Sequence, residues 1–566
     1  MTNRTYLRPL AGALIAAVLL AGCQSTQPAG APAAAFSEFV YSGIEANPAA
    51  TADATTFANP ILTGFYPDPS ITRVGADFYL VHSTFTWFPG LPVWHSTDLV
   101  NWTQIGNALD RPGMLDFDGL GLSRGVFAPT IEHHDGVFYI ANTCVDCGGN
   151  CVITASNPAG PWSDPIWVEH VGGIDPSLFF DEDGKVWMMN NDAPPGGSTY
   201  DGHRAIWLRQ VHPETFAALS EPVVIIDGGV RPEDKPIWIE GPHIYKRGGW
   251  YYLSAAEGGT AVGHSQVILR SRMIEGPYDA FHGNPIMTQR DLPEDRPFPV
   301  TSVGHADFVI DDAGEWWVTF LGVRPYEGDY YNTGRETFLL PVTWKDGWPI
   351  ILDPGAVLPI SVRKPALPPS PAPALPTTGT FKVVEDFTGP ELPPHWMTPR
   401  VPKSDWFRAG EGQVTLTPRP DTLGSGGQPS FLARRQQHIQ ASADVTLDFE
   451  PAPGEEAGLA AFQSDEFWFA LGITKAADGT RVIRLRQRGG PGDPVAGRVL
   501  AEVPAETAGN VRFRFEAKGA VYIASWSTGE EDWRPLGPPL DGKLLSTRTA
   551  GGFVGAVFGM YAERTP

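Results

Sequence analysis

Short runs of aromatic and aliphatic residues recur five times between residues 57 and 360, each bounded by Gly or Asp turns. Runs this short, rich in aromatic residues and separated by turn residues, are typical of β-strands. No long stretch with the 3.6-residue period of an amphipathic helix follows the N-terminus. The five runs are Phe78–Leu80, Phe138–Ile140, Val186–Met188, Tyr251–Leu253 and Trp316–Val318.

A related short motif precedes each run, and Asp68-Pro69-Ser70 is the first of them. A repeat of roughly 45–65 residues built from short strands predicts a β-propeller, here with five blades. The innermost strand of each blade starts near the central axis, so equivalent motif positions should converge there. The motifs are centred on Asp68, Ala128, Asp175, Glu240 and His305.

Acidic residues occupy this position in three of the five repeats. Asp68 and Asp175 share one position, and Glu240 lies one residue earlier in its own repeat. A single Asp-Pro pair is ordinary turn chemistry. The common register across the repeats predicts that three carboxylates and one histidine gather at the mouth of one channel.

A second all-β unit follows the repeats. Apolar and polar residues alternate from Ala443 to Phe449, and again over 511–515 and 521–525, as in antiparallel strands with one buried face. We therefore predict a β-sandwich, jelly-roll-like, over 380–566. The expected order is a propeller over 57–360, a Pro-rich linker or surface strap over 361–379, and then the sandwich.

Length and charge narrow the functional class. A chain of 566 residues is long enough for two or three domains. Its formal net charge of −23 argues against nucleic acid and anionic membranes as partners. The charge suits a neutral substrate, although solubility outside the cell explains it equally well.

The N-terminus reads as an export signal. Residues 1–22 combine two arginines with an apolar segment too short to span a membrane. Leu20-Ala21-Gly22-Cys23 resembles a bacterial lipobox, which implies cleavage before Cys23 and lipidation of its thiol. Gln24 then favours the outer membrane, on its periplasmic side or at the cell surface. The alternative is a plain secretory signal with an incidental cysteine, and 23–56 should form a disordered tether.

Three further cysteines, Cys144, Cys147 and Cys151, form one cluster. In an exported protein a local disulfide with one thiol left over is possible, as are three reduced thiols. A zinc site is the rival, but no fourth ligand of suitable spacing follows. We assign these cysteines no catalytic role.

Carboxylates that face one another across a neutral pocket can cleave a glycosidic bond. One, kept protonated by burial or a like charge, donates a proton to the leaving oxygen, while the other attacks or activates water. Arg335, just after the fifth run, can reach the centre to bind hydroxyls or to hold a carboxylate ionised. Candidates to stack on a sugar ring are Phe85, Trp87 and Phe127.

At these motifs the sequence resembles glycoside hydrolase family 43, in particular its β-xylosidases and α-L-arabinofuranosidases with a C-terminal β-sandwich. The resemblance covers nearly the whole mature chain and keeps the order of the motifs. The segments that carry it are Tyr66–Ser70, Ser83–Gly90, His95–Trp102, Ile239–His243, Ala256–Thr260, Gly304–Asp307 and Gly334–Thr337.

The resemblance implies an inverting mechanism without a required cofactor. Asp68 would be the general base on water and Glu240 the general acid, with Asp175 tuning the pKa of Glu240 and fixing its orientation. Arg335 would contact the substrate, and His305 would sit in the channel beside a bound Ca²⁺ or a water. The implied aromatic positions around the sugar are Phe85 and Phe127, with Phe553 of the sandwich at the pocket rim.

We therefore predict an exo-acting β-1,4-xylosidase on short xylo-oligosaccharides. The first alternative is an α-L-arabinofuranosidase on arabinoxylan or arabinan fragments. An alternative of another class is a surface lipoprotein that binds carbohydrate without catalysis, but a binding protein needs no protonated Glu opposite an ionised Asp. The segment Gly121–Gly125 fits a nucleophile-elbow pattern in the wrong context, because a strand with Pro129 follows where a helix is required.

Overall fold

A computed structural model describes residues 33–505, 509–529 and 532–565. The predicted signal peptide and the predicted lipidation site at Cys23 lie outside these residues. The described chain is almost entirely β-structure, with a short α-helix, α1 (Thr547–Ala550), and two 3₁₀ turns, η1 (Pro232–Asp234) and η2 (Gly542–Leu545). None of its helices is long and apolar enough to cross a membrane.

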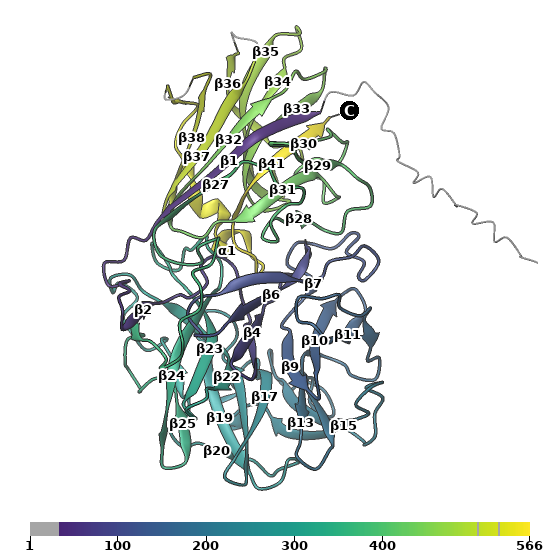
Figure 1. The fold of residues 1–566 in the computed structure, drawn as a ribbon, viewed down its shortest axis with the longest axis vertical. Coiled ribbons are helices and arrows are strands. Elements are labelled where there is room, and N and C mark those ends of the chain that lie inside the picture. The colour runs from purple at the N-terminus through teal and green to yellow at the C-terminus, as the bar shows by residue number, and fades with distance from the viewer. Residues whose placement is uncertain (1–32, 506–508, 530–531, 566) are drawn as a thin grey trace, which may run out of the picture. The chain divides into compact units, whose positions relative to one another are not determined.

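Five antiparallel sheets of the described chain form the propeller, which confirms the predicted fold (Figure 1). Their innermost strands, β3, β9, β13, β17 and β22, contact one another in turn and close a ring around the axis. The first sheet contains β3 (Ser70–Val74), β4 (Asp77–Val81), β6 (Gly90–Ser96) and β7 (Thr103–Leu109), and the second contains β8 (Gly125–Val126), β9 (Thr130–His134), β10 (Val137–Val145), β11 (Gly149–Ala155) and β12 (Ile166–Trp167). The third contains β13 (Ile174–Phe180), β14 (Val186–Asp192), β15 (Ala205–Val211) and β16 (Val223–Asp227), and the fourth contains β17 (Glu240–Arg247), β18 (Trp250–Glu257), β19 (Ser265–Ser271), β20 (Asp279–Ala280) and β21 (Met287–Thr288). The fifth contains β22 (Thr301–Ile310), β23 (Trp316–Val323), β24 (Glu336–Lys345) and β25 (Trp348–Ile350).

The start and the end of the propeller are tied together by short pairings. β2 (Thr56–Ala58) pairs with β26 (Ser361–Arg363), and Leu62 forms a bridge with Thr337. Beyond β26, Ser370 accepts a hydrogen bond from the Thr97 N–H at 2.6 Å and donates its own N–H to Asp98 at 2.8 Å. The Pro-rich segment is thus held against the first blade.

Two sheets pack face to face to form the sandwich. The core between them contains the predicted alternating residues Ala443, Val445 and Leu447, which are buried. The first sheet contains β29 (Phe407–Gly410), β30 (Gln413–Leu416), β1 (Ala34–Ile44), β32 (Gln440–Asp448), β37 (Val511–Lys518), β38 (Val521–Ser527) and β39 (Arg534–Pro535), with β27 (Phe381–Glu385) beside β1 and β40 (Leu540–Asp541) beside β38. The second contains β31 (Ser430–Arg435), β41 (Val557–Arg564), β33 (Glu455–Ser464), β34 (Phe467–Lys475), β35 (Arg481–Gly489) and β36 (Arg498–Pro504).

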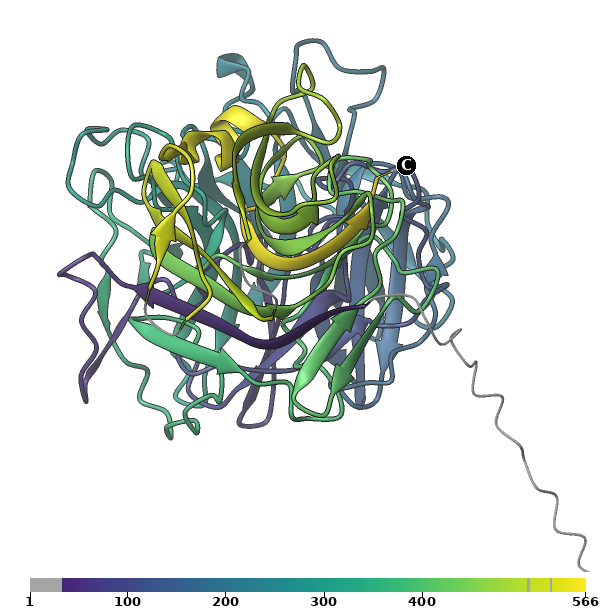
Figure 2. The same ribbon diagram turned by 90° about the horizontal axis from the view of Figure 1, so that it is seen from above.

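The strand β1 corrects one prediction. The disordered tether predicted over 23–56 is wrong for Ala34–Ile44, which lies inside the first sandwich sheet and pairs with β27, β30 and β32 (Figures 1 and 2). Phe36, Phe39 and Tyr41 of this strand are fully buried in the sandwich core. Apolar side chains therefore keep the strand in place, although the small and polar residues around it resemble a linker.

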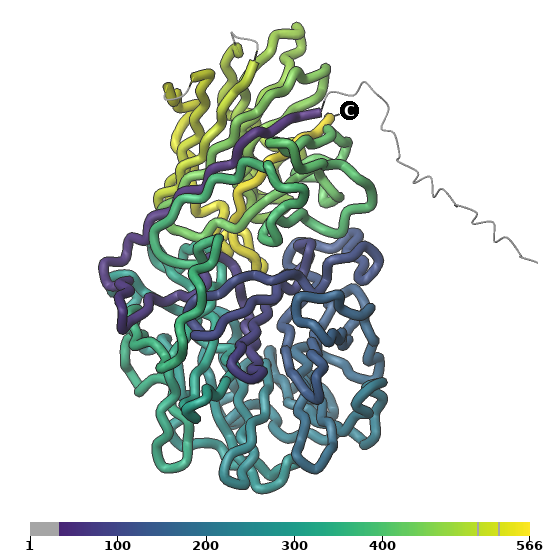
Figure 3. The backbone as a smooth tube through the Cα atoms, in the orientation of Figure 1, coloured from purple at the N-terminus to yellow at the C-terminus, as the bar shows by residue number. Residues whose placement is uncertain are grey.

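The chain thus contributes to the sandwich before it builds the propeller (Figure 3). A further pairing joins the two parts, between β5 (Trp87–Phe88) of the first blade and β28 (Thr398–Pro399), which lies between the sandwich strands β27 and β29 along the chain. A shared cluster of buried side chains surrounds that pairing, with Phe65 and Trp87 packed among residues that include Phe431, Phe462 and Trp468.

Candidate active site

The predicted axial residues converge on one cavity of about 490 Å³. Asp68, Asp175, Glu240, His305 and Arg335 all line it, and each is at most 7% exposed. They come from four different blades, so the ring of innermost strands assembles the site from segments far apart in the sequence.

An unusual backbone conformation marks the shared position in the repeats. Asp68, Asp175 and His305 have left-handed φ angles of 54°, 56° and 53°, and Gly241 has 55°. Non-glycine residues rarely adopt this conformation, and where they do it often marks a functional site. Strand pairing is also irregular beside Asp175 and beside Gly241. Glu240 precedes the left-handed residue of its blade, which accounts for its offset of one position.

Asp68 is buried beside a cation. The Arg335 Nη1 donates to its Oδ1 at 2.9 Å, and the Ser83 hydroxyl donates to its Oδ2 at 2.5 Å. Burial alone would raise the pKa of this carboxyl, but the Arg335 charge and the Ser83 hydrogen bond outweigh it and hold the pKa below its usual value. Asp68 is therefore ionised at neutral pH.

The pKa values of the other two carboxyls, Asp175 and Glu240, shift in the opposite direction. Burial, followed by the negative charge of Asp68, raises the pKa of Asp175 to about 7. The Asp175 Oδ2 accepts the N–H of Gly241 at 3.1 Å, which ties it to the residue next to Glu240. Burial and the charges of Asp175 and Asp68 raise the pKa of Glu240 well above its usual value. The shift favours the protonated form of Glu240, as a general acid requires.

His305 lies in the cavity as a neutral imidazole, because burial lowers its pKa to about 4. Within the described parts of the chain, no group of three or more His, Cys, Asp or Glu side chains is placed to hold a metal ion. Ca²⁺ beside His305 stays a prediction of the resemblance.

Three aromatic rings close one side of the cavity. Phe553 stacks on Phe85 with 5.8 Å between ring centroids, and Phe127 meets both rings edge-on at 5.6 Å. The guanidinium carbon of Arg335 lies 5.4 Å from the Phe553 centroid. All three rings line the cavity, as predicted, and the sandwich supplies one of them.

Trp87 does not reach the cavity, so its predicted contact with substrate is wrong. Its side chain is fully buried, and its ring packs against Phe431 and Phe462 of the sandwich at 6.4 and 6.2 Å. The backbone between Phe85 and Trp87 turns, since Phe85 has a φ of 56° and the Trp87 N–H bonds back to the Thr84 carbonyl. This turn places Phe85 in the cavity and Trp87 in the interdomain core.

Several residues of the cavity wall were not predicted. Arg124, Ile237, Trp238 and Thr260 line it beside the predicted residues. Trp238 carries the guanidinium of Arg204 over its ring at 4.1 Å. Trp238 has a left-handed φ of 53° and precedes β17, so strand alternation from Glu240 could not have identified it.

Ser123, the centre of the segment that matches a nucleophile elbow, has a structural role. Its Oγ accepts the N–H of Phe553 at 2.8 Å and so fastens the sandwich loop to the propeller. Cys144 and Cys147 form a disulfide, and Cys151 is a buried free thiol whose pKa burial raises to about 12. One local disulfide with a thiol left over was among the predicted possibilities.

An ionised carboxylate and a protonated one at the same cavity, beside aromatic rings, can hydrolyse a glycosidic bond. The fold and the site together define a propeller glycoside hydrolase.

Comparison with known proteins gives the same class. Residues 57–349 match Glycosyl hydrolases family 43, and residues 384–565 match the beta xylosidase C-terminal concanavalin A-like domain. A xylosidase/arabinosidase of Butyrivibrio fibrisolvens is 37% identical over 88% of this chain and 94% of its own length. A non-reducing end alpha-L-arabinofuranosidase of Bacteroides ovatus is 38% identical over 88% and 90%.

Solved structures are similar over both domains. A family 43 enzyme from a capybara gut metagenome superimposes with a TM-score of 0.85 at 37% identity, covering 94% of this chain and all of that one. A xylan beta-1,4-xylosidase from Bacillus halodurans gives 0.80 at 32% identity, covering 90% and 96%. The chain belongs to glycosyl hydrolase family 43 and is a glycoside hydrolase.

Proposed function

We propose that the protein is an exo-acting, inverting β-1,4-xylosidase that releases xylose from the ends of xylo-oligosaccharides. The observation that carries the proposal is that Asp68 and Glu240 line one cavity and that their surroundings shift their pKa values in opposite directions, down for Asp68 and up for Glu240. The volume of this cavity lies within the range of about 300–1,000 Å³ that is usual for small-molecule sites. Phe553 narrows one side of it, which favours a pocket for a terminal sugar over an open groove.

In the proposed mechanism Asp68 accepts a proton from water, which attacks the anomeric carbon of the bound sugar. Glu240 donates its proton to the glycosidic oxygen as that bond breaks. Arg335 keeps Asp68 ionised through the contact at 2.9 Å. Asp175 raises the pKa of Glu240 and, through the Gly241 N–H, supports the backbone next to it. The anomeric configuration inverts because water attacks the face opposite the leaving group.

A second candidate activity is α-L-arabinofuranoside hydrolysis. The Bacteroides ovatus relative, which is as similar as any reported above, is named for that activity, and the Butyrivibrio relative is named for both. The two sugars present similar arrays of hydroxyls. Parallel assays with 4-nitrophenyl β-D-xylopyranoside and 4-nitrophenyl α-L-arabinofuranoside will rank the two activities.

The decisive variant is Glu240→Gln, which keeps the shape of the side chain but has no proton to donate. We expect kcat on xylobiose to fall roughly 10²- to 10⁴-fold, the usual contribution of general acid–base catalysis. Unchanged turnover would rule out Glu240 as the acid. Proton NMR of the first-formed anomer tests inversion separately, and a retained configuration would exclude Asp68 as a base on water.

A further inference from the structure

Arg124 lies at the outer part of the cavity and has no role in the mechanism above. Its side chain is 44% exposed, whereas those of Asp68 and Arg335 are 6% and 7% exposed. The catalytic carboxylates therefore lie deep in the pocket, and Arg124 lies toward solvent. In an exo-acting enzyme the terminal sugar occupies the deep end, so the leaving group extends toward the solvent-facing part of the pocket, where Arg124 lies.

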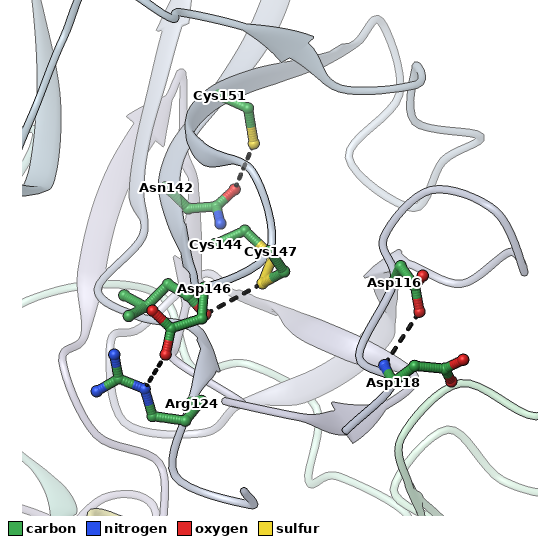
Figure 4. The surroundings of a disulfide bond; sticks show 9 residues. Asp116, Asp118, Arg124, Asn142, Cys144, Asp146, Cys147 and Cys151 are labelled. Carbon is green, nitrogen blue, oxygen red and sulfur yellow. Dashed lines mark hydrogen bonds and ion pairs between the residues drawn. A yellow bond between two sulfur atoms is a disulfide. The ribbon is translucent and has the colours of Figure 1, made fainter. Parts of the chain in front are cut away.

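Strand register places Arg124 next to an acidic partner. β8 pairs with the end of β10, with Val126 opposite Cys144 and Gly125 opposite Val145. One step further along this antiparallel ladder, Arg124 stands beside Asp146. The Arg124 Nε donates to the Asp146 Oδ2 at 2.7 Å, as Figure 4 shows.

A disulfide closes the loop that carries Asp146. Cys144 and Cys147 flank it with Sγ atoms 2.04 Å apart (Figure 4). The Cys147 N–H donates to the Cys144 carbonyl at 3.2 Å. Behind the loop the Thr143 hydroxyl donates to Asn150 at 2.6 Å. An exposed ion pair by itself contributes little to order, because both side chains lose rotamer freedom in forming it. Here the acidic partner stands on a covalently closed turn, which reduces that cost.

The outer edge of the Arg124 guanidinium is left for a ligand. Its Nε is engaged by Asp146, and among the described residues neither Nη group has a hydrogen-bond partner. Arg335, by contrast, uses an Nη group on Asp68. A planar guanidinium with two free Nη groups can donate to two adjacent oxygens at once. Neutralised by Asp146, it suits uncharged hydroxyls better than a second carboxylate.

We propose that Arg124 binds two neighbouring hydroxyls of the leaving-group sugar, and that the Cys144–Cys147 loop positions it for this through Asp146. The inference rests on the proposed function and adds a residue that distinguishes an oligosaccharide from a glycoside with a non-sugar leaving group.

The test compares two substrates in one variant. 4-Nitrophenyl β-D-xylopyranoside has a leaving group without sugar hydroxyls, whereas xylobiose has a leaving xylose. For Arg124→Ala we expect kcat/KM on xylobiose to fall about 10-fold, and kcat/KM on the aryl glycoside to change less than about 2-fold. Equal losses on both substrates, or no loss on either, would overturn the proposal. Wild-type turnover of both substrates tests the proposed function separately.

Arg111→Ala is the matched control. Arg111 is 40% exposed, pairs with Asp164 at 2.7 Å, and does not line the cavity. We expect it to leave the ratio of the two kcat/KM values unchanged. Arg124→Lys keeps the charge but loses the two-pronged donor, so most of the selective loss should remain. Full recovery in Arg124→Lys would contradict the two-hydroxyl contact.

The role of the loop has its own variant, in which both Cys144 and Cys147 become Ser. Asp146 then stands on an open turn, and we expect a selective loss of about 3-fold on xylobiose with the aryl glycoside unaffected. A purely structural role would lower the melting temperature and both activities together. A double variant with wild-type kcat/KM on xylobiose would show that the disulfide does not position Arg124.

Discussion

At the scale of single residues, the three buried carboxyls of the site differ in pKa because each one faces different neighbouring groups. Asp68 faces a guanidinium and a hydroxyl, whereas Asp175 and Glu240 face mainly other carboxyls and apolar surroundings. Under the same burial, the pKa of Asp68 is therefore lowered and the pKa values of Asp175 and Glu240 are raised, as the proposed base and acid require. Positive φ angles at Asp68 and Asp175 are the backbone conformations from which these side chains line one cavity.

The neighbouring charge predicts a pH effect for Asp175→Asn. The negative charge of Asp175 raises the pKa of Glu240, and with a pKa of about 7 Asp175 carries that charge on the alkaline side of neutrality. Its removal lowers the pKa of Glu240, so Glu240 loses its proton at lower pH. We expect the alkaline limb of the kcat/KM–pH profile to move about one unit toward acid. An alkaline limb that stays in place, or moves upward, would contradict the assigned coupling.

At the scale of elements, β1 shows how a strand can hide in a linker-like segment. Its bulge between Phe36 and Glu38 interrupts the alternation of buried and exposed positions. Its register with β32 nevertheless continues to Ile44 opposite Gln440. The strand is one of the central members of its sheet, so the sandwich depends on residues that precede the propeller.

We therefore expect Phe39→Ala to destabilise the protein substantially. Phe39 is fully buried and meets Trp396 edge-on at 5.0 Å. Removing a buried phenylalanine typically lowers the free energy of unfolding by about 3–5 kcal/mol. Urea unfolding followed by tryptophan fluorescence will measure it. Ile44→Ala, at the 54%-exposed end of the same strand, should change the free energy by about 0.5 kcal/mol or less. Similar values for both variants would mean that β1 is not integral to the sandwich.

At the scale of the whole molecule, the catalytic cavity belongs to both domains. The loop after α1 carries Phe553 to the propeller, where Ser123 accepts its N–H. The shared core around Trp87 and Phe431 fastens the same two surfaces nearby. The sandwich is therefore part of the active site as well as an attached domain.

Two neighbouring glycines test this contact between the domains. Gly552 and Gly551 both have positive φ angles, of 75° and 72°, so alanine strains the backbone at either position. A Cβ on Gly552 would stand 2.2 Å from the Ser123 Oγ, whereas a Cβ on Gly551 would meet nothing within 4 Å. We expect Gly552→Ala to displace Phe553 and to lower kcat/KM roughly 10- to 100-fold, with Gly551→Ala much closer to wild type. Equal kcat/KM values for the two variants would contradict a contribution of Phe553 to the activity of the site.

The repeat register was enough to predict the propeller and the convergence of Asp68, Asp175 and Glu240. Short strands in series leave few ways to bury their apolar faces, and a closed ring brings equivalent positions together. The same reasoning failed for Trp87, because a local turn in the chain reverses its direction two residues after Phe85. It also missed Arg124, whose partner Asp146 becomes a neighbour only through the pairing of β8 with β10.

The sequence by itself determined the all-β composition, the order of the domains and the chemical groups available for catalysis, because these follow from local patterns and from repetition. Only the tertiary structure decided which carboxyls have raised pKa values, which aromatic rings line the cavity, and that residues before the propeller complete the sandwich. Those properties depend on burial and on neighbours contributed by distant segments, and a pKa or a ring contact has no value until those neighbours are in place.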